Sequence, residues 1–214
     1  MTEKPEIYVL AGANGVGKTT LNLLAIPRAI TFINADDIAK QLKERLGDIN
    51  VQELANAQAL EHMNALIAER QDFAIETNLA DQDTWQFLKG LQSLGYLVRL
   101  YFFGVSDVDI CINRVFNRVP QGGHFVHPDI VKMRYEAGLK LLRQHKHIPD
   151  QLILTDNEGE STNCAELRLG EVIWKSETLP DWATFVLANE AAATPTNSTI
   201  EDIREKYRRM KDGK

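Results

Sequence analysis

The stretch Gly12-Ala-Asn-Gly-Val-Gly-Lys-Thr19 decides the fold of this 214-residue chain, because it matches the pattern G-x-x-x-x-G-K-[ST] at every fixed position. The apolar run Ile7–Ala11 before it predicts a short buried strand, and the residues after it predict a helix. A glycine-rich turn between a strand and a helix lets backbone N–H groups converge on an anion beside the positive end of the helix dipole. The stretch therefore predicts a phosphate-binding loop for a nucleoside triphosphate.

Glycine, lysine and threonine each suit phosphate binding for a physical reason. Glycine permits backbone conformations that a Cβ would block. We expect Lys18 to place its charge on the β- and γ-phosphates, and the Thr19 hydroxyl to bind Mg²⁺. A chance match in an ordinary turn is the alternative, and the flanking strand and helix disfavour it. The expected nucleotide-binding residues are Gly12, Ala13, Asn14, Gly15, Val16, Gly17, Lys18, Thr19 and Thr20.

Short apolar runs alternate with longer amphipathic stretches along the rest of the chain. Strands are predicted at Thr31–Ile33, Phe73–Ile75, Tyr96–Phe103 and Leu152–Leu154, and Leu169–Trp174 is a candidate edge strand. Helical periodicity fills the intervals, at 38–46, 51–70, 85–91, 106–115 and 128–142. Such alternation predicts an α/β fold in which helices cover both faces of a parallel sheet.

The composition is that of an ordinary globular protein, with 24 basic and 30 acidic side chains and a net charge of −6. Any site for a polyanion must therefore be a local cluster of positive charge. Two distant cysteines, Cys111 and Cys164, exclude a disulfide framework and a thiolate zinc site. No apolar run reaches the roughly 20 residues that span a bilayer, and no secretion signal is evident. We expect a cytoplasmic protein.

Acidic residues follow two of the predicted strands. Asp36 and Asp37 come after Thr31–Ile33, and Glu76 comes after Phe73–Ile75. The carboxyl ends of parallel strands share the edge where ligands bind, so we expect Asp36 and Glu76 to face Lys18. A carboxylate there can accept the proton of an attacking hydroxyl. We expect one aspartate to cap the next helix and Asp36 to do the chemistry, while a cap or a surface loop is the alternative for Glu76.

A cluster of positive charge stands further along the chain. Arg114 and Arg118 are four residues apart and share one face of a predicted helix, and Arg134 lies on the next helix. The guanidinium fork suits phosphoryl oxygens and the charge of the transition state. The turn at 120–124, with two glycines and His124, predicts a lid over the nucleotide in which the histidine contacts phosphate or has a structural role. A solvated face paired with acids is the alternative.

Missing motifs narrow the class of nucleotide-handling protein. The sequence has no N-K-x-D segment of a GTPase and no evident signature of a transporter-type ATPase. A small-molecule kinase remains, acting on a hydroxylated metabolite. The alternative from another class is an ATP-binding switch or interaction module, and the net charge disfavours a nucleic-acid end kinase.

The pattern changes after Trp174, where we place a domain boundary. Residues 1–175 are expected to form a P-loop kinase-like domain, and residues 176–214 a C-terminal extension. Residues 191–197 read as a linker, and the segment from Ser198 to Glu201 fits a capping box. An apolar stripe among basic residues then predicts an amphipathic tail helix, docked on the body or binding a partner or an anion. The stripe consists of Ile200, Ile203, Tyr207 and Met210.

Five of these segments occur in an order that resembles the zeta-toxin-like family of small P-loop kinases, in its chromosomal predicted-kinase branch. They are Gly12–Thr19, Asn34–Asp37, Ile75–Thr77, Arg114–His124 and Asp156–Gly159, and the likeness covers about residues 5 to 175. The resemblance implies a P-loop NTPase fold with a five-stranded parallel sheet in the order 2-3-1-4-5. It also implies ATP with Mg²⁺ as donor and an acceptor hydroxyl, which in toxin members belongs to UDP-N-acetylglucosamine.

The same resemblance implies roles for single residues. Asp36 matches the catalytic base and Glu76 the acceptor-binding glutamate, with Asp37 beside the acceptor pocket. Arg118 matches one transition-state arginine, with Arg114 or Arg134 as the second. Thr77 and His124 join the expected substrate-binding residues, and Asn157 stands in the loop expected to contact adenine. A sugar nucleotide is one candidate acceptor, beside a nucleoside, a dinucleotide or another sugar. A toxic member would have an antitoxin protein that covers its ATP site.

Overall fold

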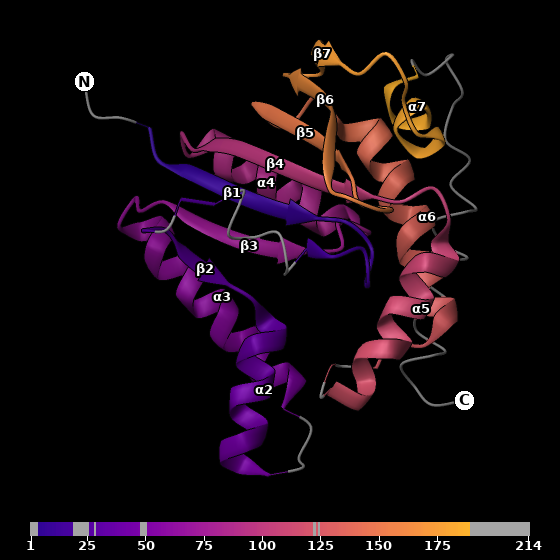
Figure 1. Ribbon diagram of the computed structural model, residues 1–214. Coiled ribbons are helices and arrows are strands. Elements are labelled where there is room, and N and C mark those ends of the chain that lie inside the picture. The colour runs from indigo at the N-terminus through magenta and orange to yellow at the C-terminus, as the bar shows by residue number, and fades with distance from the viewer. Residues whose placement is uncertain are drawn as a thin grey trace.

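The computed structural model of the chain describes residues 4–18, 26–27, 29–47, 51–121, 123 and 125–188. These residues form one seven-stranded sheet with flanking helices (Figure 1). The strands are β1 (Glu6–Ala11), β2 (Thr31–Ile33), β3 (Phe73–Thr77), β4 (Leu97–Gly104), β5 (Gln151–Asp156), β6 (Thr162–Arg168) and β7 (Glu171–Lys175). The helices are α2 (Ala35–Leu46), α3 (Gln52–Ala68), α4 (Gln82–Ser93), α5 (Val108–Arg118), the 3₁₀ turn η1 (Val119–Gln121), α6 (Pro128–His145) and α7 (Asp181–Leu187).

The spatial order of the first five strands is β2-β3-β1-β4-β5, all parallel, as the resemblance implied. The prediction of a purely parallel five-stranded sheet is wrong at one edge, where β6 and β7 continue the sheet antiparallel. Leu169 and Gly170, with φ of 49° and 87°, turn the chain between β6 and β7. Positive φ at both residues is typical of the tight turns that join antiparallel strands, which need no crossover helix.

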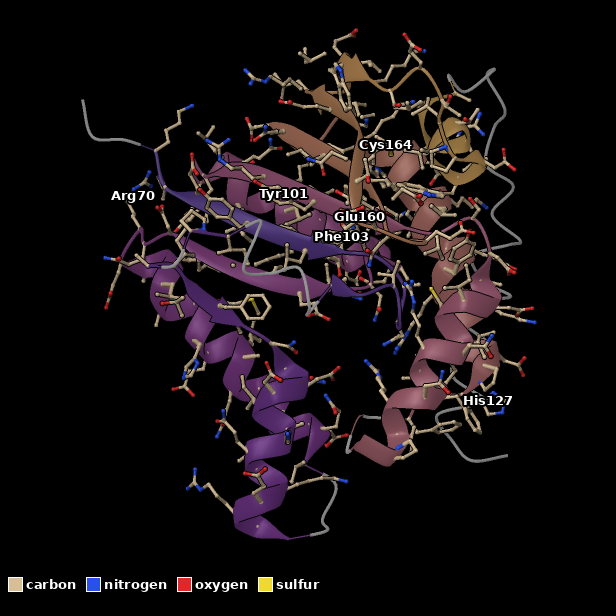
Figure 2. The ribbon with its side chains drawn as sticks, in the orientation of Figure 1. Arg70, Tyr101, Phe103, His127, Glu160 and Cys164 are labelled. Atoms are coloured by element: carbon tan, nitrogen blue, oxygen red, sulfur yellow. The ribbon has the colours of Figure 1, made fainter. Side chains whose placement is uncertain are left out.

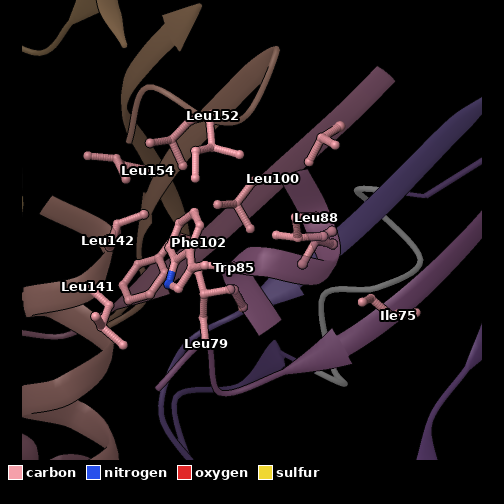
Figure 3. Packing of buried hydrophobic residues seen from close by; sticks show 14 of the residues in the cluster. Ile75, Leu79, Trp85, Leu88, Leu100, Phe102, Leu141, Leu142, Leu152 and Leu154 are labelled. Carbon is pink, nitrogen blue, oxygen red and sulfur yellow. The ribbon is translucent and has the colours of Figure 1, made fainter. Parts of the chain in front are cut away.

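Alternate residues of the central strands pack on opposite sides of the sheet. The larger core lies between one face and the helices α3, α4, α6 and α7, and Figure 3 shows its centre around Trp85 of α4 and Phe102 of β4. On the other face, Leu10 and Phe103, which is labelled in Figure 2, pack against Cys111 and Val115 of α5. Helices therefore cover both faces, as predicted. Full burial stabilises a large apolar side chain by about 1.5–3 kcal/mol, so these two layers fix the strand ends that carry the candidate site.

Helix α7 packs on the larger core through Trp182, Ala183 and Val186. The Trp182 ring lies 5.9 Å from the Phe102 ring between centroids, and its Nε1 donates to Asp156 Oδ1 at 3.2 Å. The compact body thus continues beyond residue 175, where the sequence suggested a boundary. The division into two parts stays a prediction, and the tail helix expected after residue 197 lies outside the described residues.

Helices α2 and α3 form a hairpin with a small core of its own, made by Ala39, Leu42, Val51 and Ala55. In Figure 1, α2 stands away from the sheet. The side chain of Asn34 caps α2 by accepting from the Asp36 N–H at 2.9 Å. The expectation that an aspartate caps this helix is therefore wrong. Asp36 and Asp37 are exposed in the first turn, where carboxylates meet the positive end of the helix dipole.

The helices of the described ranges are all too short or too polar to cross a membrane.

Candidate active site

The loop between β1 and Lys18 is pressed against two neighbouring elements. Gly12 and Gly15 have φ of 140° and 81°. A Cβ at Gly12 would overlap the Phe103 carbonyl oxygen at the end of β4, and one at Gly15 would overlap the Cys111 carbonyl oxygen on α5. Gly17, with φ of 102°, would meet the side chain of Asn157 in the same way. Glycine is thus required at these positions both by the backbone conformation and by close packing.

Lys18 lies inside this loop with only 5% of its surface exposed. Its Nζ donates to the carbonyl oxygens of Gly12 at 2.7 Å and Ala13 at 3.1 Å, and lies 3.5 Å from Asn78 Oδ1. Burial lowers the pKa of Lys18 to about 8, although the carboxylate of Glu76 opposes this shift. The loop therefore holds an ammonium that is poorly solvated and ready to gain from an anionic partner.

Glu76, near the end of β3, connects Lys18 with the start of α2. Its Oε1 lies 3.8 Å from Lys18 Nζ, and its Oε2 accepts a hydrogen bond from Asn34 Nδ2 at 3.2 Å. Asn34 in turn caps α2 at the Asp36 N–H. Asp36 and Arg118 both influence the pKa of Lys18, Arg118 lowering it and Asp36 raising it. The structure thus joins Lys18, Glu76 and the start of α2, where Asp36 lies, at the carboxyl edge of the sheet.

The three predicted arginines have different surroundings. Arg134 of α6 donates from Nη1 to Asn14 Oδ1 at 2.8 Å, so its guanidinium reaches the loop. Arg114 instead donates from Nη1 to the carbonyl oxygen of Asn157 and from Nη2 to that of Glu158, both at 2.9 Å. Arg134 therefore reaches the phosphate-binding loop at Asn14, whereas Arg114 holds the segment that follows β5.

Asn157 in that segment supports the loop directly. Its Nδ2 donates to the Val16 carbonyl oxygen at 2.6 Å, and its own N–H donates to the Gly104 carbonyl oxygen at 2.9 Å. Together with the two bonds from Arg114, these contacts lock the end of β5 to the phosphate-binding loop. The loop is therefore shaped by residues from both halves of the chain.

The remaining predicted residues lie elsewhere or outside the described ranges. Thr77 Oγ1 accepts from the Leu79 N–H at 3.0 Å, which fixes the turn after β3. Asp37 is exposed on α2. Thr19, Thr20 and His124 lie outside the described residues.

Three asparagines contact charged groups of the site, and sequence reasoning did not assign them these contacts. Asn14 binds Arg134, Asn34 binds Glu76, and Asn78 lies beside Lys18. The capping role of Asn34 had a local signal, because asparagine before an acidic first turn is a favoured helix start. The other two contacts join distant segments, so local spacing carries no signal for them.

Comparison with known proteins gives both a family and a fold. The sequence profile of the zeta toxins matches residues 1–164. An uncharacterized protein of Haemophilus influenzae is 34% identical over 127 residues, covering 58% of this chain and 88% of the relative.

Solved structures resemble the chain at low sequence identity. A chain of the AvrRxo1-ORF1:AvrRxo1-ORF2 complex with sulphate ions has a TM-score of 0.68 at 13% identity, over 94% of this chain and 71% of that one. A chain of the PezAT chromosomal toxin–antitoxin system of Streptococcus pneumoniae has a TM-score of 0.55 at 14% identity, over 100% of this chain and 89% of that one. A predicted kinase of Chloroflexus aurantiacus has a TM-score of 0.51 at 20% identity, over 64% of this chain and 80% of that one. At such identities these likenesses show a shared fold.

Proposed function

Because the chain belongs to the zeta toxin family, we propose that it is an ATP-dependent phosphotransferase that moves the γ-phosphate to a hydroxyl of a small metabolite. The family match supports a function of the P-loop kinase kind. The observation that carries the proposal is the position of Lys18. Its buried ammonium lies within 3.8 Å of the Glu76 carboxylate, and Glu76 is linked through Asn34 to the helix start that bears Asp36.

Binding of ATP follows from the loop. Backbone N–H groups and Lys18 are the groups that hold the β- and γ-phosphates in loops of this sequence. In the free protein the Lys18 ammonium is bonded to the carbonyl oxygens of Gly12 and Ala13. Phosphate oxygens would replace these neutral acceptors with charged ones, so that each bond becomes a short charge-assisted ion pair. A structural neighbour, the AvrRxo1-ORF1:-ORF2 complex, was solved with ATP, which supports the same ligand here.

The proposed transfer uses the carboxylates at the neighbouring strand ends. Asp36 accepts the proton of the acceptor hydroxyl, while the oxygen of that hydroxyl forms a bond to the γ-phosphorus. The bond from that phosphorus to the bridging oxygen of the β-phosphate breaks, and ADP leaves with the electron pair. Glu76 orients the acceptor, and Asp37 and Thr77 are proposed to contact it. Arg118 and Arg134 stabilise the charge that spreads over the transferred group.

Some parts of the proposal rest on the family resemblance. Mg²⁺ would shield the phosphate charges, and its predicted ligand Thr19 lies outside the described residues, as does His124 of the lid. The segment around Asn157 is proposed to contact adenine. The acceptor is proposed to be a hydroxylated metabolite such as a UDP-N-acetyl sugar. A structural neighbour belongs to a toxin–antitoxin system, so we include an antitoxin protein among the proposed partners.

A screen of metabolite extracts with labelled ATP tests the proposal. Wild-type protein should yield a labelled product that Lys18→Ala does not make. Asp36→Asn should bind ATP with nearly unchanged affinity and lose transfer, by roughly 10²–10⁴-fold for a general base. Glu44→Gln is the matched control, since it removes an exposed carboxylate further along the same helix and should retain most of the activity. Transfer by Asp36→Asn at a near-wild-type rate would refute Asp36 as the base. Tight ATP binding without any labelled product would favour an ATP-binding switch instead.

A further inference from the structure

The outermost strand of the sheet, β7, presents apolar side chains to solvent. It ends the spatial order of the sheet, with no strand of the described residues beyond it (Figure 1). All of its residues are exposed, including Val172 at 45%, Ile173 at 58% and Trp174 at 50%. An exposed edge strand offers unpaired backbone N–H and C=O groups to another strand, and clustered apolar exposure marks interaction sites.

The residue order of β7, Glu171-Val-Ile-Trp-Lys175, is complementary to itself when two copies run antiparallel. Pairing about Ile173 sets Glu171 of each copy opposite Lys175 of the other, twice by symmetry. It also sets Val172 opposite Trp174, and such aromatic and β-branched pairs stabilise sheets, as do opposite charges placed directly across. Parallel pairing in register would instead oppose glutamate to glutamate and lysine to lysine.

We propose that β7 is the interface of a two-fold symmetric homodimer, in which two copies join edge to edge through antiparallel β7 strands. The axis passes at Ile173, so one patch serves both copies, as in other two-fold interfaces. Ile173 has no Cα partner in β6, because the register shifts between Glu166 and Leu167. With the axis at this residue, the exposed side chain of Ile173 meets the Ile173 side chain of the second copy.

The C-terminal segment of the same chain, residues 189–214, is the competing occupant of this edge. Its apolar residues Ile200, Ile203 and Tyr207 recur at helical spacing. A free sheet edge pairs with a strand, whose side chains alternate between two faces, so a segment with helical spacing fits this edge poorly. The second copy supplies such a strand and also neutralises the charges at both ends of β7. A contact between two five-residue strands is small beside the roughly 1,200–2,000 Å² of stable complexes, so we expect weak association that depends on protein concentration.

Sedimentation velocity of the full chain, from 1 to 300 µM, provides the first test. Wild type should shift from monomer to dimer with rising concentration. Glu171→Lys alone and Lys175→Glu alone each create two like-charge pairs and should weaken the dimer by roughly tenfold or more. The double variant Glu171→Lys/Lys175→Glu restores both opposite pairs and should dimerise like wild type. A wild type that stays monomeric throughout, or a double variant that is no tighter than the single ones, overturns the proposal.

Cross-linking tests the position of the axis. Ile173→Cys should form an intermolecular disulfide under mild oxidation, because antiparallel partners lie about 4.5–5.5 Å apart between Cα atoms, within disulfide range. Gly90→Cys is the control, at a solvent-facing position of α4 with no neighbouring atom within 4 Å. The native thiols Cys111 and Cys164 are buried, and burial raises the pKa of each to about 11, so they add little background. Equal cross-linking at the two positions overturns the proposal.

Hydrogen exchange distinguishes the second copy from the chain's own tail. Protection of the β7 amides that rises with protein concentration supports the dimer. Protection of these amides in the monomer, independent of concentration, means that a segment of the same chain covers the edge and overturns the proposal.

Discussion

The buried ammonium of Lys18 should make the stability of the free protein rise in alkaline solution. Burial lowers its pKa from the ordinary 10.5 to about 8 in the folded state. Between these two values the unfolded chain holds a proton that the folded protein has released. The free energy of unfolding rises with pH wherever the unfolded state binds more protons. Lys18 therefore contributes a gain in stability that begins near pH 8 and ends near pH 10.5.

The size of this gain follows from the two pKa values. Each unit of pH in the window contributes up to about 1.4 kcal/mol, and the gain from pH 7 to pH 9.5 is about 2 kcal/mol. Lys18→Met removes the titrating group and keeps a side chain of similar length. The difference in unfolding free energy, wild type minus Lys18→Met, should therefore rise by about that amount over this range.

Urea unfolding of both proteins at several pH values measures the difference directly, and other titrating groups cancel in it. Lys40→Met is the control, because Lys40 is an exposed lysine on α2. A difference between wild type and Lys18→Met that stays constant from pH 7 to pH 9.5 would refute the buried, desolvated state of Lys18. Saturating ATP should abolish the rise, because a phosphate partner keeps the ammonium charged.

Three further substitutions test the packing and the support of the site. Gly104→Ala would drive a Cβ into the Trp182 ring and should lower the unfolding free energy by about 1–3 kcal/mol in urea, whereas Gly90→Ala, with open space on α4, should raise it by up to about 1 kcal/mol. Arg114→Ala removes two hydrogen bonds to the segment after β5, so calorimetry should show ATP binding weakened several-fold, and unchanged affinity would contradict its supporting role. Leu88→Ala empties a fully buried position and should cost about 2–5 kcal/mol in thermal or urea unfolding; a cost under 1 kcal/mol would contradict the packing of Figure 3.

Sequence patterns predicted the parallel part of the fold because that part has strong periodic signals. The runs that became β1 and β4 are almost continuously apolar, as strands covered on both faces are. β6 was missed because Thr162–Arg168 mixes exposed polar with buried residues and has only a weak alternation. Its place in the sheet depends on the short connection at 157–161, which reverses the chain after β5 where the α/β pattern leads one to expect a crossover.

The loop glycines and Lys18 could be named from sequence because their chemistry lies within eight consecutive residues. The contacts that organise the rest of the site join segments far apart in the chain. Asn34 and Glu76 are 42 residues apart, and Asn14 and Arg134 are 120 apart. Helical spacing predicted that Arg114 and Arg118 share one face of a helix. The Arg114 guanidinium instead donates to carbonyl oxygens of the segment after β5. Such choices depend on tertiary neighbours that local spacing does not describe.

The hydrogen bond from Asn157 to the Val16 carbonyl oxygen has a consequence for the protein during its synthesis. The two residues are separated by 141 positions, so the first strand and its glycines leave the ribosome long before their support exists. Chains grow at about 5–20 residues per second, and the interval therefore lasts roughly 7–30 seconds. During this time a nascent chain carries the complete phosphate-binding motif without the asparagine that shapes it. The loop is thus completed late, when most of the polypeptide has been made.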